Sequence, residues 1–233
     1  MAADIVGISS MATRQILAEL SGAYRQKTGK SVAIEAVGGV DASKRIRAGE
    51  KFDIVVLADD AMKKLEADGF LKPGSRAGFA ESSIAVAVPA GTKRPDLSSE
   101  AMTKAAVLAA QSVGYSTGPS GTHVLKLLER WGVDAKDTKK VVQASPGVPV
   151  GTLVARGEVE LGFQQMSEFL EVQGIEVAGM LPAEIQSVTL FACGVGAQAG
   201  NEAGARDLIG YLTSPDTNGI KWKHGMEPPQ RAG

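Results

Sequence analysis

GYSTGPSGTHVLKLLERWG, Gly114–Gly132, joins three kinds of sequence in a row. It opens with an apolar lead-in typical of a short buried strand, continues with small and hydroxyl residues, and ends as an amphipathic helix that Gly132 stops. The bare turn Gly118-Pro119-Ser120-Gly121 stands directly before the helix. The stretch therefore predicts a strand, a small-residue loop and a helix, the repeating unit of a parallel α/β sheet.

The same unit recurs upstream. Its copies are Asp4–Ile8 with Thr13–Gly29, Ser31–Ala36 with Val37–Gly49, and Asp53–Gly69. In the first copy four residues fall on one helical face, namely Ile16, Leu17, Leu20 and Tyr24. In the second we expect Asp41 to cap the helix and Gly49 to end it. This alternation predicts right-handed crossovers and a mainly parallel sheet with helices on both faces.

Two longer β-rich runs, Ser82–Gly91 and Ser187–Val195, do not fit one simple sheet. They predict that the chain crosses twice between two lobes. We expect lobe I to comprise residues 1–83 and 188–233 and lobe II residues 84–187, with a hinge of crossing strands at the junctions. The predicted class is α/β, a two-lobed fold of mixed, mainly parallel sheets flanked by helices. A ligand cleft between the lobes is the expected site, since ligands favour domain interfaces and the carboxyl ends of parallel strands.

Four loops of small residues precede predicted helices, two in each lobe: Ile8–Thr13, Val37–Ser43, Ser116–Thr122 and Ala144–Thr152. A helix N-terminus has unpaired N–H groups and a partial positive charge, so such loops let an anion reach the amides. Any one of them is more simply an N-cap or a turn. Four together favour an anion site.

Composition excludes several other partners. With 25 basic and 26 acidic side chains, the net charge of −1 gives no support for nucleic acid or an acidic membrane surface. The single cysteine, Cys193, excludes an internal disulfide, and His123 and His224 lack zinc spacing, so we expect no metal and no other cofactor. The start of the chain fits either a cytoplasmic protein or a mature form whose leader was removed.

Individual side chains leave alternatives open. His123 is a candidate ligand contact or general base near Ser120, and its plainer interpretation is a packed or solvent-facing ring. Gln164 and Gln165 follow a predicted strand, where a cleft-facing amide and an exposed loop amide fit equally well. The turn lacks the Lys-Ser/Thr of a P-loop, and Thr122 replaces the last glycine of a nucleophile elbow.

Five stretches, in order, resemble the molybdate-binding-protein branch of the type II periplasmic solute-binding proteins of ABC transporters. They are GISSMATRQILAEL, RIRAGEKFDIVVLADDAMKKLEADG, GPSGTHVLKLLERWGV, LVARGEVELGF and YLTSPDTNGIKWKHGMEP. The resemblance covers the chain from Ile5 to about Pro228. It implies a periplasmic mature form and an ABC permease as partner, and we expect a monomer.

The resemblance also implies site residues. The family's first serine falls on Ser10, its second near Gly39 or Val40, where this chain has no hydroxyl, and a phenol donor falls on Gln165. The expected ligand-binding residues are Ser9, Ser10, Arg14, Gly39, Val40, Thr117, Ser120, Gly121, Gly147, Val148 and Gln165. A carboxylate ligand would attract a cation, for which Arg14, Lys44 and Arg45 are candidates if they are not simply solvated.

The leading hypothesis is a receptor of an ABC importer that closes on a small anion, either an oxyanion such as molybdate or tungstate or a small organic carboxylate. The alternative is an isomerase resembling aconitate isomerase, which acts on a tricarboxylate with His123, Ser10 and Ser120 as catalytic candidates. A ligand-sensing regulatory domain is a third class, although the chain has no helix-turn-helix extension.

Overall fold

The computed structural model describes residues 3–230, and the chain divides into two compact units. Unit 1 comprises the chain up to Ser82 together with the chain from Leu190 onwards, and unit 2 comprises Ser83–Thr189. Two strands each contain a boundary between the units, β4 (Ala77–Pro89) and β9 (Val188–Val195). No helix among residues 3–230 is long and apolar enough to span a bilayer.

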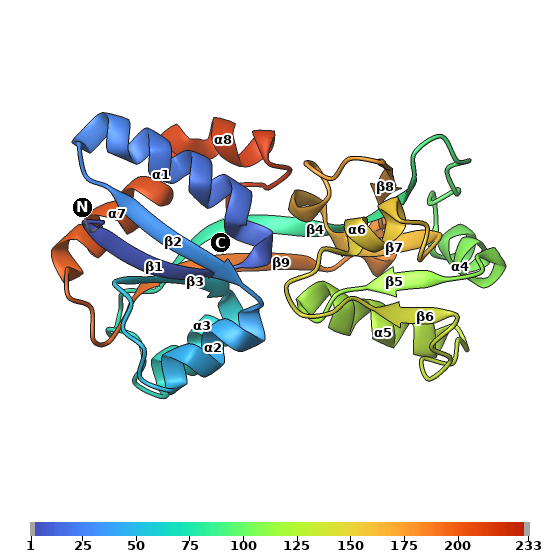
Figure 1. Ribbon diagram of the computed structural model, residues 1–233, viewed down its shortest axis with the longest axis horizontal. Coiled ribbons are helices and arrows are strands. Elements are labelled where there is room, and N and C mark those ends of the chain that lie inside the picture. Colours follow the sequence, from blue (N-terminus) through green and yellow to red (C-terminus); the bar gives the residue numbers. More distant parts are fainter. Residues whose placement is uncertain (1–2, 231–233) are drawn as a thin grey trace. The chain divides into compact units, whose positions relative to one another are not determined.

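Unit 1 is built on a sheet in the order β2-β1-β3-β9. Strands β1 (Ile5–Ser10), β2 (Val32–Val37) and β3 (Ile54–Ala58) are parallel, and β9 is antiparallel to β3. Its helices are η1 (Met11–Thr13), α1 (Arg14–Thr28), α2 (Gly39–Arg47), α3 (Asp59–Ala67), α7 (Glu202–Leu212), η4 (Pro215–Thr217) and α8 (Asn218–Lys223). Figure 1 shows α1, α7 and α8 on one face of this sheet and α2 and α3 on the other.

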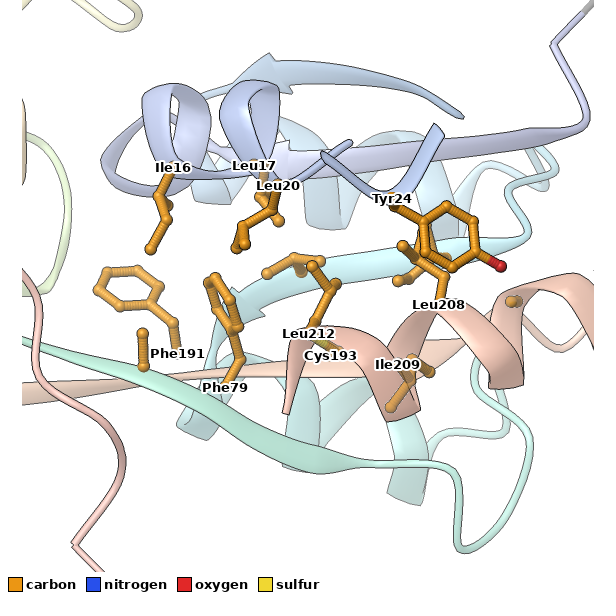
Figure 2. Close-up of a cluster of buried hydrophobic side chains, with 14 of the residues drawn as sticks. Ile16, Leu17, Leu20, Tyr24, Phe79, Phe191, Cys193, Leu208, Ile209 and Leu212 are labelled. Atoms are coloured by element: carbon orange, nitrogen blue, oxygen red, sulfur yellow. The ribbon is translucent and has the colours of Figure 1, made fainter. Parts of the chain in front are cut away.

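Strand alternation explains the two covered faces of unit 1. Ile5 belongs to the apolar cluster under α1 and α7, whereas Ile8 belongs to the cluster under α2 and α3. As predicted, Ile16, Leu17, Leu20 and Tyr24 are all buried, and Figure 2 shows them pointing from α1 toward Phe79, Cys193 and Leu208. The predicted mainly parallel sheet with helices on both faces is confirmed.

Unit 2 has the sheet order β4-β7-β5-β6, with β8 on the other edge of β4. Strands β5 (Val113–Tyr115), β6 (Val141–Gln143) and β7 (Leu161–Gln165) are parallel, while β4 is antiparallel to β7 and to β8 (Ile175–Met180). Its helices are α4 (Glu100–Ala109), α5 (Pro119–Arg130), α6 (Val150–Ala155), η2 (Met166–Glu168) and η3 (Ala183–Ile185). Ile84 and Ala85 of β4 lie in separate clusters, so this sheet is also covered on both faces.

The predicted helix ends at Gly29, Gly49 and Gly132 are confirmed, but the predicted N-cap at Asp41 is wrong. Gly29, Gly49 and Gly132 have φ between 76° and 92°, the left-handed conformation that ends a helix. Asp41 does not cap α2, because the helix begins one residue after Gly38 and Asp41 is already in its first turn. There its carboxylate lies 3.7 Å from Lys44 Nζ.

Candidate functional site

The parallel strands of unit 1 bring three helix starts to one edge of the sheet. Ser10 of β1 is paired with Val37 of β2, and β3 ends nearby at Ala58. Each strand runs at once into a helix, namely η1 with α1, then α2, then α3. This is the carboxyl-end edge at which α/β folds bind ligands.

Unit 2 repeats the arrangement. Tyr115 of β5 is paired with Gln143 of β6 and with Phe163 of β7, so these strands end at one edge. The starts of α5 and α6 and the side chain of Gln165 follow there. Tyr115 is buried at this edge, and burial raises the pKa of its phenol.

The helix starts at these two edges differ from those of α4 and α7. α4 is capped by its own Ser99, whose Oγ accepts from Met102 N at 3.2 Å, and α7 by Asn201, whose Oδ1 accepts from Gly204 N at 2.9 Å. In the part of the chain that the structure describes, no N-cap side chain closes η1, α1, α2, α5 or α6. In α2 and α5 the first N–H groups therefore remain available to an anion.

The helices at these edges also differ in whether their first turn contains an acidic residue. Within residues 3–230, η1, α1, α5 and α6 have no acidic residue in the first turn. α2 carries Asp41 there, and α3, also uncapped, carries Asp59 and Asp60. Because each carboxylate lowers the positive charge at a helix start, α3, with two, is a poorer anion site than α2, with one.

Ser9 and Ser10 point to opposite faces of β1, so their side chains have different neighbours. Ser9 is fully buried, and its Oγ has no hydrogen-bond partner among residues 3–230. Ser10 Oγ lies 3.5 Å from Thr13 Oγ1, which itself donates to Ser10 O at 3.0 Å. The predicted hydroxyl of Ser10 therefore lies beside η1, the short turn that leads into α1.

The three candidate cations differ in their pairing. Arg45 binds Glu50 and Glu35, and Lys44 faces Asp41. Arg14, the exposed first residue of α1, forms no ion pair within the described chain. It is the cation of this group that remains free for a ligand.

The opening turn of α5 is held by hydroxyls and by one glycine. Ser116 Oγ and the buried Ser120 Oγ are 3.0 Å apart, and Gly118 N donates to Ser116 Oγ at 3.4 Å. A Cβ on Gly121 would stand 1.7 Å from Ser116 O, so no other residue fits there without moving the loop. Thr117 is exposed at the rim of this turn.

The loop before α6 offers fewer amides than the sequence predicts. Val148 N donates to Ser145 O at 2.9 Å, and Val150 N donates to Gln164 Oε1 at 2.8 Å. Gly147, with φ of 78°, keeps an N–H without a partner among residues 3–230. Unit 2 therefore offers its most complete set of open amides at α5.

Gln164 and Gln165 are both buried, so the exposed-amide alternative is wrong for both. Gln164 is a positioning residue that joins the start of α6 to Glu168 through its Nε2 at 2.8 Å. Gln165 Nε2 donates to Thr189 Oγ1 at 2.8 Å, whereas Gln165 Oε1 has no partner in the described part of the chain. Such a buried acceptor costs free energy until a donor reaches it.

His123 does not pair with Ser120 in the described structure. Its Nε2 lies 2.8 Å from Ile185 O, and because a carbonyl only accepts, Nε2 carries the hydrogen. Nδ1 is then the one basic nitrogen of the neutral ring. Ser120 Oγ pairs with Ser116 instead.

Gln186 is a residue that the sequence analysis missed. Its Oε1 accepts from Ile84 N at 2.8 Å and from Ser187 N at 2.9 Å, while its Nε2 donates to Ile84 O at 3.0 Å and Leu181 O at 3.1 Å. One amide thus fixes the unit 2 end of β4 to the segment that enters β9. A lone glutamine before a strand gives no sequence signal of this role.

A pocket of about 110 Å³ lies at the opposite end of the unit 1 sheet, where β3 begins and β9 ends. Phe52, Phe70 and Gly196 are among its lining residues. It contains none of the predicted ligand residues.

Nearly the whole chain matches one protein family. A model described as bacterial extracellular solute-binding protein matches residues 5–227. The chain belongs to this family. The predicted resemblance to periplasmic solute-binding proteins is therefore confirmed.

Among curated relatives, this solute-binding protein is 33% identical to an aconitate isomerase from Pseudomonas sp over 227 residues, 95% of the chain and 86% of the relative. Among solved structures, the Azotobacter vinelandii periplasmic molybdate-binding protein has a TM-score of 0.81 at 20% identity, covering 97% of this chain and 100% of that one. The tungstate ABC transporter structure from Geobacter sulfurreducens has a TM-score of 0.70 at 18% identity, covering 93% and 96%. The solute-binding protein thus has the type II periplasmic binding fold.

Proposed function

We propose that this solute-binding protein captures a small anion in the periplasm and delivers it to the permease of an ABC importer. One observation carries the proposal: in the described chain, α2 of unit 1 and α5 of unit 2 each start at the carboxyl edge of their sheet without a side chain that closes the first N–H groups. Such starts bind anions through backbone N–H groups and the helix dipole.

The proposed contacts divide between the units. Unit 1 contributes Ser9, Ser10, Arg14 and the amides of Gly39 and Val40, and unit 2 contributes Thr117, Ser120, Gly121, Gly147 and Gln165. The lobes of the proposed receptor are residues 1–83 with 188–233, and 84–187. It acts as a monomer without a cofactor.

Thermal unfolding tests the proposal. The purified protein is heated alone and with molybdate, tungstate, sulfate, phosphate, or di- and tricarboxylates. A ligand at a hundred times its dissociation constant adds about 2.7 kcal/mol to the free energy of unfolding, which raises the midpoint by several degrees. If no small anion raises the midpoint, the proposed function is wrong.

A second candidate function follows from the 33% identical relative, whose printed name is aconitate isomerase. In this alternative, His123 Nδ1 removes a carbon-bound proton from a tricarboxylate and returns it to another carbon, while open amides stabilise the enolate. Incubation with trans-aconitate, followed by proton NMR, tests it. Turnover that is lost in His123→Gln, whose side-chain amide still reaches Ile185 O as a donor, would support the enzyme. Binding without turnover would exclude it.

A further inference from the structure

Gln165 has one buried end that lacks a hydrogen-bond partner. The residue is 2% exposed, and its Nε2 donates to Thr189 Oγ1 at 2.8 Å. Its Oε1 has no partner among residues 3–230. Folded proteins leave few buried acceptors without a hydrogen, because such a group loses its bonds to water and gains nothing in return. An open acceptor at the carboxyl edge of unit 2 therefore points to a ligand that supplies the hydrogen.

The neighbouring glutamine of the same strand shows that an open end is not usual for a buried amide in β7. Gln164 is also 2% exposed, but both of its ends are bonded. Its Oε1 accepts from Val150 N at 2.8 Å, and its Nε2 donates to Glu168 at 2.8 Å. Gln164 has a structural role that uses its whole amide, whereas Gln165 keeps half of its amide for another partner.

The register of the sheet places Gln165 on the face that α5 covers. Gln165 is paired with Ile84 of β4, so the two side chains lie on the same face. Ile84 belongs to the apolar cluster that contains Val124 and Leu127 of α5. Because β5 and β7 are parallel and end at one edge, Gln165 lies at the edge where α5 begins. All of these residues belong to unit 2.

The start of α5 supplies the donors that an anion needs. The N–H groups of Ser120 and Gly121 have no partner within the described residues, and the first turn contains no acidic residue. The oxygens of an anion accept from such N–H groups. A fully deprotonated anion has acceptors only, so it would place an oxygen against Gln165 Oε1 without a hydrogen between them. An anion with its own O–H group satisfies both the amides and the glutamine.

Resting on the function proposed above, we propose that Gln165 is a specificity-determining residue that selects an anion with its own O–H group over one that has none. The oxygens of the anion accept from the N–H groups of Ser120 and Gly121, and its O–H group donates to Gln165 Oε1. A hydroxycarboxylate and hydrogen phosphate both have this chemistry. Thr189 is a positioning residue, because its Oγ1 holds Nε2 and leaves Oε1 for the ligand.

Calorimetric titration at neutral pH tests the proposal with three pairs of probes, each differing in one O–H group. The pairs are malate and succinate, citrate and propane-1,2,3-tricarboxylate, and phosphate and sulfate. Gln165→Met, which keeps the length of the side chain without its acceptor, is compared with wild type. Gln111→Met is the matched control, because Gln111 is exposed and precedes β5, at the other end of that strand from α5. Thermal unfolding of each variant alone checks that it folds.

Wild type and Gln111→Met should bind the O–H member of at least one pair more tightly than its partner, by at least roughly tenfold. In Gln165→Met this preference should fall to about one, mainly through weaker binding of the O–H member. The pair that shows the preference identifies the ligand as a hydroxycarboxylate or as hydrogen phosphate.

Equal affinities within every pair that binds would overturn the inference and leave the proposed function intact, since the amide would then present Nε2 to the anion. A preference that persists in Gln165→Met would also overturn it. If none of the six probes binds, the inference is wrong, and the thermal unfolding series with the wider set of anions decides separately on the proposed function.

Discussion

Gly121 is the residue on which the opening turn of α5 depends. The carbonyl of Ser116 occupies the space of a Cβ, at 1.7 Å, so any side chain must push β5 and α5 apart. The effect is steric and does not involve backbone strain, because Gly121 is not among the glycines with positive φ in the described chain.

We expect Gly121→Ala to lower the free energy of unfolding by about 1–3 kcal/mol, as overpacking does. Urea denaturation measures it. Gly210→Ala is the control, because Gly210 is an exposed position in α7 where an added Cβ would meet nothing within 4 Å. This substitution should raise the free energy of unfolding by up to about 1 kcal/mol. Equal effects of the two substitutions would contradict the steric argument.

Lys221 is buried to 1% exposure in unit 1, with its Nζ 5.7 Å from the centre of the Phe79 ring and 3.3 Å from Asn218 Oδ1. Burial lowers the pKa of its ammonium group. The unfolded chain therefore binds more protons than the folded one between the lowered pKa and the ordinary value, and stability rises with pH across that window.

The free energy of unfolding of wild type should consequently rise, relative to that of Lys221→Met, as pH increases toward the ordinary lysine pKa of 10.5. Both proteins carry Cys193→Ala in this comparison, because the buried Cys193 thiol, whose pKa burial raises, interacts with the charge of Lys221. Lys44→Met, at an exposed lysine, should run parallel to wild type. If the free energy of unfolding changes with pH in the same way in wild type and in Lys221→Met, burial of this lysine does not cause the pH dependence.

At the scale of the element, the start of α5 is a helix end left open. Its N-cap, Gly118, has extended φ and ψ and room for a side chain, because the nearest heavy atom to a Cβ there is Ser116 Oγ at 3.9 Å. An aspartate at this position would accept from the open amides of Ser120 or Gly121 in place of a ligand.

Gly118→Asp should therefore raise the free energy of unfolding by about 0.5 kcal/mol while weakening anion binding at least roughly tenfold. Gly118→Ala leaves the amides open and should keep the ligand. Denaturation and calorimetry on the same samples measure both quantities. If Gly118→Asp binds the ligand as tightly as wild type, the amides of α5 are not part of the site.

Elements were more predictable than contacts. The strand–loop–helix unit and the buried face of α1 follow from short-range periodicity, so the sequence predicts them correctly. Asp41 was misplaced as a cap because two glycines let α2 start earlier than its first polar residue. The roles of Gln164 and Gln186 depend on partners far along the chain, and an amide carries no pattern that names its partner.

At the scale of the whole molecule, the net charge is −1, because 25 basic and 26 acidic side chains nearly balance. Such a molecule has no strong long-range field with which to steer an anion. Capture then depends on contacts made after encounter.

We expect the association rate constant of an anionic ligand to change by less than about threefold between 20 and 200 mM salt, because screening acts mainly on long-range steering. Stopped-flow fluorescence of the exposed Trp222 and the buried Trp131 provides a signal to test. A tenfold fall would indicate that Arg14 or another local cation guides the ligand.

The crowded turn at Gly121 also bears on how such a protein changes its ligand over evolution. With the space at that position filled by a carbonyl, descendants of this chain have almost no freedom there. Thr117 and Val148, both solvent-facing, can be replaced at little cost to stability. New ligand preferences should therefore arise first at these rim positions, around an α5 turn that stays the same.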